Sequence, residues 1–207
     1  DPWMMMDKYG VDTLRLWMYS VNQPGESKNF DEKTVALLHQ QVFGLLYNVL
    51  TFYELYRDRF LETNILKLKP NSILDKWILA RLNELIELTT KNLDNYKLLE
   101  PTREIKDFIV DLSTWYLRRS RERIKEGDKE AKMTLYFTLK TLAKIMAPFA
   151  PFAAEDIWLK LKTAKDVESV HLAKWPSLSK IKHSDILKNM RMSRKIVSLG
   201  LEARQKA

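Results

Sequence analysis

The sequence has no cysteine and only three histidines, His39, His171 and His183, which stand far apart along its 207 residues. Without cysteine the chain can form no disulfide framework, thiol nucleophile or thiolate zinc site. The scattered histidines lack the spacing of a metal cluster. Also missing are a glycine-rich phosphate loop, a His-Glu-x-x-His pair and a Gly-x-Ser-x-Gly turn. We therefore expect neither an active site nor a bound cofactor or metal in this chain.

Glycine is scarce, with five residues, and long apolar runs are missing. Tight turns and hairpins demand glycine, so its scarcity beside many Leu, Glu, Lys and Arg residues favours helices over sheet. No apolar stretch approaches the roughly 20 residues that span a bilayer, and the first residues lack the basic and apolar regions of a signal peptide. We expect an all-α, cytoplasmic protein with no membrane partner.

Positive charge exceeds negative charge: 35 Lys and Arg residues against 27 Asp and Glu residues give a formal net charge of +8. Most of the excess lies in residues 180–207, which contain eight basic and two acidic residues. A basic chain fits a polyanionic partner such as nucleic acid, and it also fits a merely basic soluble protein. The charge indicates a class of partner without identifying it.

Four long segments carry apolar residues three and four positions apart, which is the spacing of an amphipathic helix. They cover about 31–60, 72–96, 101–126 and 129–146, and a double proline in 147–151 ends the last one. In the first helix the expected buried face is Val35, Leu38, Val42, Leu45, Val49, Phe52 and Tyr56. Four long helices joined by short links predict a helical bundle.

Three smaller pieces flank this bundle. Residues 1–22 read as two short helices hinged at Gly10, a short helix covers 152–161, and an amphipathic helix begins near Ser184. The chain begins without an initiator Met and ends at Ala207 within a helical pattern. We expect it to be an excised part of a larger protein.

Aromatic and basic side chains gather in one segment, WYLRRSRERIK at 115–125. Arginine binds phosphate oxygens two at a time and stacks on unpaired bases, which favours RNA as the partner. The alternative interpretation is a solvated helix end whose cations complement the helix dipole. The aromatic residues Trp115 and Tyr116 fit a core role better than a base-stacking role, because large aromatic side chains are usually buried.

A helical wheel of 100° per residue separates the four arginines of this segment. With Ile105 at zero, Arg119 and Arg123 fall within about 40° of the apolar face, whereas Arg118 and Arg121 fall on the opposite side. An unpaired buried guanidinium is costly, so we expect Arg119 and Arg123 to pair with carboxylates or to emerge beyond the bundle, in structural roles. The predicted RNA-binding residues combine the solvent side of this segment with the basic C-terminal helix: Arg118, Arg121, Lys125, Lys188, Arg191, Arg194 and Lys195.

Five motifs, in order along most of the chain, resemble those of class I aminoacyl-tRNA synthetases of the Ile/Val/Leu/Met group. They are MDKYGVDTLRL at 6–16, LDKWILARL at 74–82, DLSTWYLRRSR at 111–121, APFAPF at 147–152, and SVHL followed by Trp-Pro in 169–176. The third and fifth are most similar to the isoleucyl members of the group, with the valyl members as the nearest rivals.

The resemblance implies a class I anticodon-binding bundle at 23–162, a stem-contact segment at 1–22 that follows the family's KMSKS loop, and a truncated C-terminal linker and basic helix at 163–207. The implied partners are tRNA(Ile) and the catalytic and editing domains of the same parent chain, in a monomer. The parent would charge isoleucine onto tRNA with ATP and Mg²⁺. This chain, which lacks the catalytic domain, would be inactive alone.

Two alternatives stay open from the sequence. One is the same region of a valyl-tRNA synthetase. The other is a helical protein-interaction bundle that is basic by chance and has no RNA role. The salt dependence of binding distinguishes the protein-interaction bundle from the two tRNA-binding interpretations. Binding through phosphates weakens steeply as the salt concentration rises, and an apolar contact between helices does not.

Overall fold

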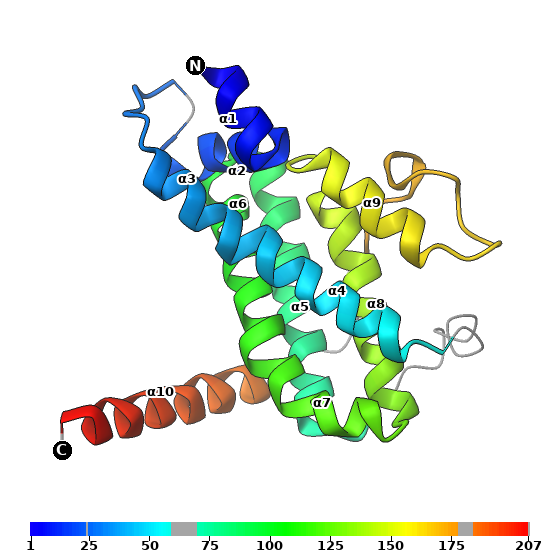
Figure 1. Cartoon of the computed structure of the whole chain (residues 1–207). Coiled ribbons are helices and arrows are strands. Elements are labelled where there is room, and N and C mark those ends of the chain that lie inside the picture. The colour runs from blue at the N-terminus through cyan, green and yellow to red at the C-terminus, as the bar shows by residue number, and fades with distance from the viewer. Residues whose placement is uncertain (24, 59–69, 178–183, 207) are drawn as a thin grey trace.

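The computed structural model describes residues 1–23, 25–58, 70–177 and 184–206, and all regular structure in these residues is helical (Figure 1). The expected all-α class is therefore confirmed. The helices are α1 Pro2–Tyr9, α2 Val11–Val21, α3 Glu32–His39, α4 Leu45–Tyr56, α5 Ile73–Leu93, α6 Leu99–Val110, α7 Arg118–Lys125, α8 Lys129–Met146, α9 Pro151–Leu161 and α10 Ser184–Lys206, with a single 3₁₀ turn at Val170–Leu172.

The helices begin and end where local residues favour it. Gly10 separates α1 from α2 with φ at 82°, a conformation that costs glycine little. Asp31 and Asp128 are N-caps whose side chains accept hydrogen bonds from the first turns of α3 and α8. Pro151 occupies the first turn of α9. The first long helix is predicted to end near Phe60, which lies outside the described residues, but α4 already ends at Tyr56, where the C-cap Arg57 is extended.

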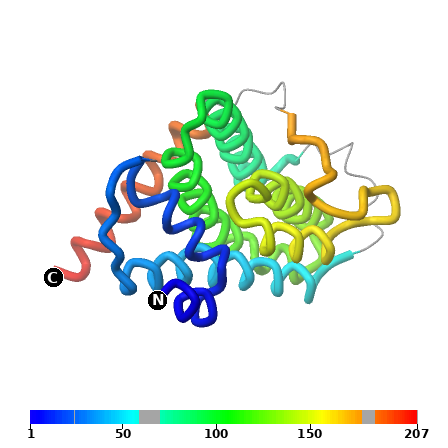
Figure 2. Tube along the Cα trace, turned by 90° about the horizontal axis from the view of Figure 1, so that it is seen from above, coloured from blue at the N-terminus to red at the C-terminus, as the bar shows by residue number. Residues whose placement is uncertain are grey.

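Long helices form the body of the molecule, and shorter ones cover its ends. Helices α5, α6–α7 and α8 pack side by side, and α3–α4 runs across them as one long helix (Figures 1 and 2). The core between them is rich in large side chains that are almost fully buried, among them Trp77, Phe108, Tyr116, Tyr136 and Trp158. The predicted bundle is therefore present.

Two π-helical turns change which residues face this core. They lie at Gln40–Gly44, between α3 and α4, and at Asp111–Leu117, between α6 and α7. A π turn holds one extra residue, so it rotates every later side chain back by about 100°. After the first turn, Leu46, Leu50 and Tyr53 are buried, in place of the predicted Leu45, Phe52 and Tyr56, which are only half-buried.

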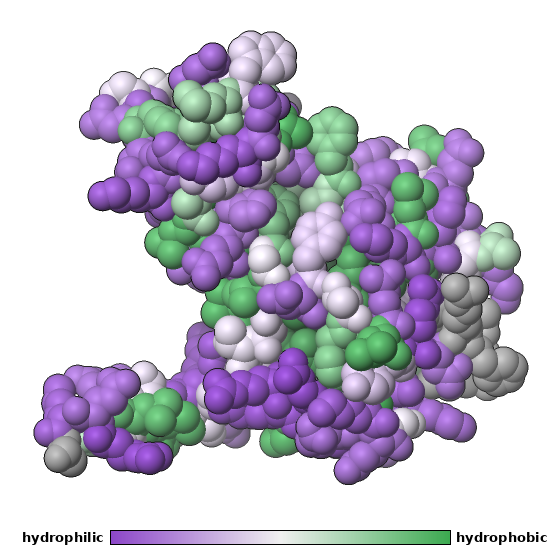
Figure 3. All heavy atoms as spheres, in the orientation of Figure 1, coloured by the Kyte–Doolittle hydropathy of each residue, from purple (hydrophilic) through white to green (hydrophobic). Residues whose placement is uncertain are grey.

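The first and last helices differ in how they attach to the bundle. The N-terminal pair is fastened to α9, because Asp12 Oδ2 accepts a 2.7 Å hydrogen bond from the backbone N–H of Ala153. Helix α10 packs on α5 through Leu187 and the half-buried Met190, and its C-terminal half projects away from the bundle (Figure 1). The surface is hollowed between the α1–α3 end and α10 (Figure 3).

The expectation that no apolar stretch approaches membrane-spanning length is wrong for the first long helix. Within the described residues, Glu32–Tyr56 is long enough and, with a mean hydropathy of 1.3, apolar enough to pass that test. One face of this helix is core, since Val35, Val42, Leu46 and Val49 have no exposed surface. A buried core helix meets the same criterion of length and composition.

Candidate nucleic-acid interface

A ridge of exposed cations follows the second π turn. Arg118, Arg119 and Arg121 of α7 are exposed, and the described part of the chain offers none of them a carboxylate partner. In space-filling view the lower edge of the molecule, over α7 and the start of α10, is strongly hydrophilic (Figure 3). We call these three side chains the α7 ridge. They are available to phosphate oxygens without first breaking an ion pair.

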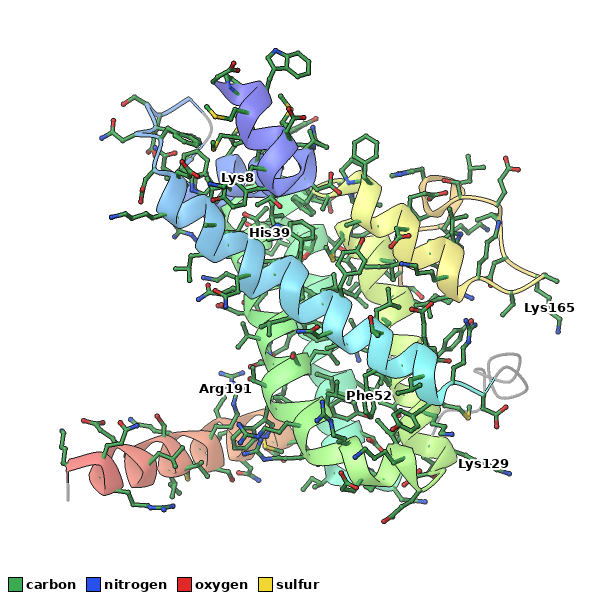
Figure 4. The ribbon with its side chains drawn as sticks, in the orientation of Figure 1. Lys8, His39, Phe52, Lys129, Lys165 and Arg191 are labelled. Carbon is green, nitrogen blue, oxygen red and sulfur yellow. The ribbon has the colours of Figure 1, made fainter. Side chains whose placement is uncertain are left out.

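Arg121 is positioned by a second helix. Its guanidinium lies 5.3 Å from the ring centroid of Phe52, a residue of α4 that lies where this helix crosses the α6–α7 helix (Figure 4). A cation over an aromatic face is held in place while its N–H groups stay free for other partners. The fourth predicted member of the segment, Lys125, instead forms a 3.0 Å ion pair with Glu122 one turn earlier.

Arg119 lies away from the apolar face on which the helical wheel places it. Of the two predicted outcomes, pairing with carboxylates or emerging from the bundle, the structure shows the second: Arg119 is exposed and lies 3.2 Å from the ring centroid of Trp115. The π turn at Asp111–Leu117 is the reason, because it moves Arg119 from about 320° to about 220° on the wheel. The pKa of Arg119 is lowered by partial burial and by the like charges of Arg118 and Arg194.

Arg123 has the structural role predicted for it. Its guanidinium donates to both carboxylate oxygens of Asp75, at 3.3 and 2.9 Å, and to Asp128 at 2.9 Å. Asp75 has no exposed surface and also accepts a 2.8 Å bond from the buried Tyr116 hydroxyl. These contacts tie α5, the α6–α7 helix and the N-cap of α8 together. They also confirm that Tyr116 belongs to the core.

The basic residues of α10 divide into two groups. Arg194 pairs with Asp111 at 2.5 Å and lies over the rings of Trp77 and Trp115, and Arg191 pairs with Glu84 at 2.9 Å. These two ion pairs fasten α10 to the bundle, with Arg191 near the start of α10 (Figure 4), so both positive charges are partly neutralised. Lys188 and Lys195 are exposed, and the described residues give them no ion pair.

Beside the start of α10 lies an open groove of mixed charge. Its volume is about 1020 Å³, and it lies between α5, α6 and α10. At its centre Arg81 donates to Glu84, Glu104 and Asp111 at 2.7, 2.7 and 3.1 Å. These hydrogen bonds outweigh the effect of burial and raise the pKa of Arg81. Carboxylates line much of the groove, so this face is a poor surface for RNA phosphates.

Sequence reasoning missed the hub at Arg81 and the contact between Trp115 and Arg119. The spacing of Arg81, Glu84, Glu104 and Asp111 is helical within each helix, but the contacts between helices depend on tertiary packing. The Trp-x-x-x-Arg spacing of 115 and 119 was the available signal, because residues four apart share one side of a helix. In the described part of the chain, no three His, Asp or Glu side chains gather as metal ligands.

Comparison with known protein families identifies the domain that contains the α7 ridge. Residues 75–207 match the family model described as the anticodon-binding domain of tRNA ligase, which is well over half of the chain. The chain belongs to the anticodon-binding domain family of tRNA ligases. The matched span holds the α7 ridge, the Arg123 network and α10, so every predicted RNA-binding residue lies within the anticodon-binding domain.

Relatives extend the likeness to the whole chain. An isoleucine–tRNA ligase of Clostridium kluyveri is 38% identical over 217 aligned residues, covering 100% of this chain and 21% of that protein. Those of Dehalococcoides mccartyi and Chlamydia muridarum are 37% and 39% identical, covering 100% and 99% of this chain. The chain thus spans about a fifth of the length of the relatives that it matches.

A solved structure supports the fold independently. A chain in the crystal structure of the ternary LeuRS–tRNA–LeuAMS complex of Agrobacterium radiobacter K84 matches 90% of this chain with a TM-score of 0.62 and 17% identity. The match covers 21% of that chain. At this identity the likeness establishes the helical architecture, and the resemblance inferred from the five sequence motifs agrees with it.

Proposed function

We propose that this chain is the part of an isoleucine–tRNA ligase that docks the anticodon arm of tRNA(Ile). The observation that carries the proposal is the α7 ridge, a set of exposed arginines that form no ion pair with the described residues, within a domain of the anticodon-binding family. The isoleucine–tRNA ligases that resemble the chain along its length favour tRNA(Ile) over the valine tRNA considered as an alternative.

In this proposal the region binds tRNA, and the rest of the parent enzyme forms the bond between isoleucine and tRNA. Arginine forks in the α7 ridge would bind backbone phosphates and set the register of the arm. Arg123 and Asp75 hold α7 rigidly on the core, so little side-chain or helix entropy is lost on docking. A rigid platform also fixes the distance between the anticodon arm and a distant acceptor end.

Charge reversal on the ridge tests this role. Arg118→Glu and Arg121→Glu should each weaken tRNA(Ile) binding and lower the slope of log K against log salt by roughly 0.7–0.9 per lost phosphate contact. Lys165→Glu is the control, because Lys165 is also exposed and lies beyond the end of α9, away from α7 (Figure 4). Filter binding to tRNA(Ile) and to a non-cognate tRNA at two salt concentrations measures all three. Equal losses in all three variants would refute the assignment.

We further infer that the chain does not catalyse by itself, although the parent uses ATP and Mg²⁺ to charge isoleucine in the cytoplasm. In the described residues no three His, Asp or Glu side chains gather as metal ligands. An isoleucine-dependent ATP–pyrophosphate exchange assay should give only the buffer rate. The division into segments 1–22, 23–162 and 163–207, and the monomeric state, stay predictions.

A protein-interaction role has one observation in its favour. The projecting half of α10 exposes Met192, Ile196 and Leu199, which are 59, 64 and 55% exposed and share one side of the helix. Such a surface would bind through apolar contact. Binding that persists unchanged in high salt would favour this alternative over RNA, because an apolar contact is not screened.

A further inference from the structure

Trp115 stands at the junction of three elements, and its contacts restrain the indole on several sides. It belongs to the π turn between α6 and α7, its Nε1 donates to the sulfur of Met190 on α10 at 3.2 Å, and the Arg194 guanidinium lies 5.4 Å from its ring centroid. The indole is only half-buried. It is therefore a fixed plane at the edge of the bundle.

Arg119 lies over the indole ring of Trp115. Its guanidinium carbon is 3.2 Å from the ring centroid, a separation at which two planar groups can only lie face to face. One face of the guanidinium is thus used by the indole, while the Arg119 side chain as a whole stays exposed. The other face of the guanidinium is the next open plane of the stack.

The charge at this position is not balanced locally. The described residues provide Arg119 with no carboxylate, and its only protein hydrogen bond is a long one, 3.5 Å, to the Trp115 carbonyl. The neighbouring Arg118 also forms no ion pair with any residue that the structure describes. The like charges of Arg118 and Arg194 contribute to lowering the pKa of Arg119. An anionic group placed here would relieve this repulsion.

We propose that Arg119, laid flat on Trp115, is a stacking platform for one unpaired nucleobase of the anticodon loop, with Arg118 binding the adjoining phosphate. A guanidinium plane accepts any base face, because stacking needs a π surface and no particular hydrogen-bond pattern. A phosphate alone would need only charge and would leave the fixed plane unused. The proposal rests on the tRNA-binding function and adds to it the residue that receives a base.

The test uses Arg119→Lys, which keeps the charge and removes the plane. Arg204→Lys is the matched control, since Arg204 is an exposed arginine near the end of α10, outside the proposed site, and no ring contacts it in the described structure. The probes are the 17-nucleotide anticodon stem-loop of tRNA(Ile) and a blunt duplex with the same stem sequence and no unpaired base. Circular dichroism melting confirms that both variants stay folded.

Arg119→Lys should weaken stem-loop binding roughly 5- to 150-fold, the range for loss of one base stack, and leave duplex binding and the salt slope unchanged. Arg204→Lys should leave stem-loop binding unchanged. 2-Aminopurine scanned through the loop should be quenched at one position by the wild-type chain and not by Arg119→Lys.

Three outcomes would overturn the platform. Wild-type affinity of Arg119→Lys for the stem-loop, or an equal loss on stem-loop and duplex, makes Arg119 a plain charge contact or no contact at all. Quenching that survives in Arg119→Lys places the stacked base elsewhere. Each of these three results leaves tRNA binding itself intact, whereas failure of the wild-type chain to bind the stem-loop at low salt would refute the proposed function as well.

Discussion

Replacing Arg123 by Met tests whether the contact between Arg123 and Asp75 holds α7 in place. The substitution keeps most of the aliphatic volume and removes both hydrogen bonds from Arg123 to a carboxylate with no exposed surface. Breaking a buried pair by removing one partner costs about 3–5 kcal/mol, because the other charge is left uncompensated. The Tyr116 hydroxyl still donates to Asp75 at 2.8 Å, so we expect the lower end, about 3 kcal/mol.

Thermal melting followed by circular dichroism measures the effect. For a chain of this size, about 3 kcal/mol corresponds to a fall of roughly 6–12 °C in Tm. Arg121→Met is the control, because Arg121 makes no ion pair with the described residues, and its Tm should change by no more than about 1–2 °C. Adding Asp75→Asn to Arg123→Met removes the stranded charge and should recover part of the loss. Equal Tm values for Arg123→Met and Arg121→Met would refute the reasoning.

Three further predictions follow from packing and charge. Leu46→Ala should cost about 2–5 kcal/mol in unfolding free energy by urea titration, and Leu45→Ala clearly less, because only Leu46 is fully buried; the reverse order would contradict the π-turn register. Burial acts to raise the pKa of Asp166, but hydrogen bonds from Lys140 and Thr163 outweigh burial, so the pKa is lowered. The contribution of Asp166 to folding stability is therefore complete above the ordinary pKa of 3.8 and is lost as the pH falls through the lower pKa of the folded state. The Tm gap between wild type and Asp166→Asn should therefore close between about pH 5 and pH 2, and a gap that is constant with pH would argue against this pair. Arg194→Ala should speed hydrogen exchange in the N-terminal half of α10 while leaving that of α8 unchanged, and equal exchange in both would show that the ion pair does not hold α10.

The sequence predicted the helices well because their signals are local. Apolar spacing and N-caps such as Asp31 and Asp128 lie within a few residues of what they control, and Ile105, Phe108, Ile109 and Leu112, which are three and four apart, are all buried. The second helix was predicted to reach Tyr96, but α5 ends at Leu93, and Tyr96 has φ at 57° and is 92% exposed.

The faces of two helices could not be predicted beyond their π turns. A uniform wheel assumes a constant rotation per residue, and one extra residue in a turn breaks that assumption for everything downstream. Arg123 still forms its predicted contact with a carboxylate, because its long side chain reaches the buried Asp75 from the edge of the core. Arg119 does not enter the core and lies exposed on the Trp115 ring. The acidic partners of Arg191 and Arg194 lie on other helices, so only the packed structure brings them together.

Hydroxyl-radical footprinting of tRNA(Ile) bound to this chain tests the central claim most directly, because it reports which sugar–phosphate positions the protein covers. We predict that the strongest protection lies in the anticodon arm and that replacing Arg118 and Arg121 together by Glu removes it at a protein concentration that saturates the wild-type complex. The account would be contradicted if the anticodon arm in the wild-type complex were as reactive as in free tRNA, or if its protection were unchanged in the double variant.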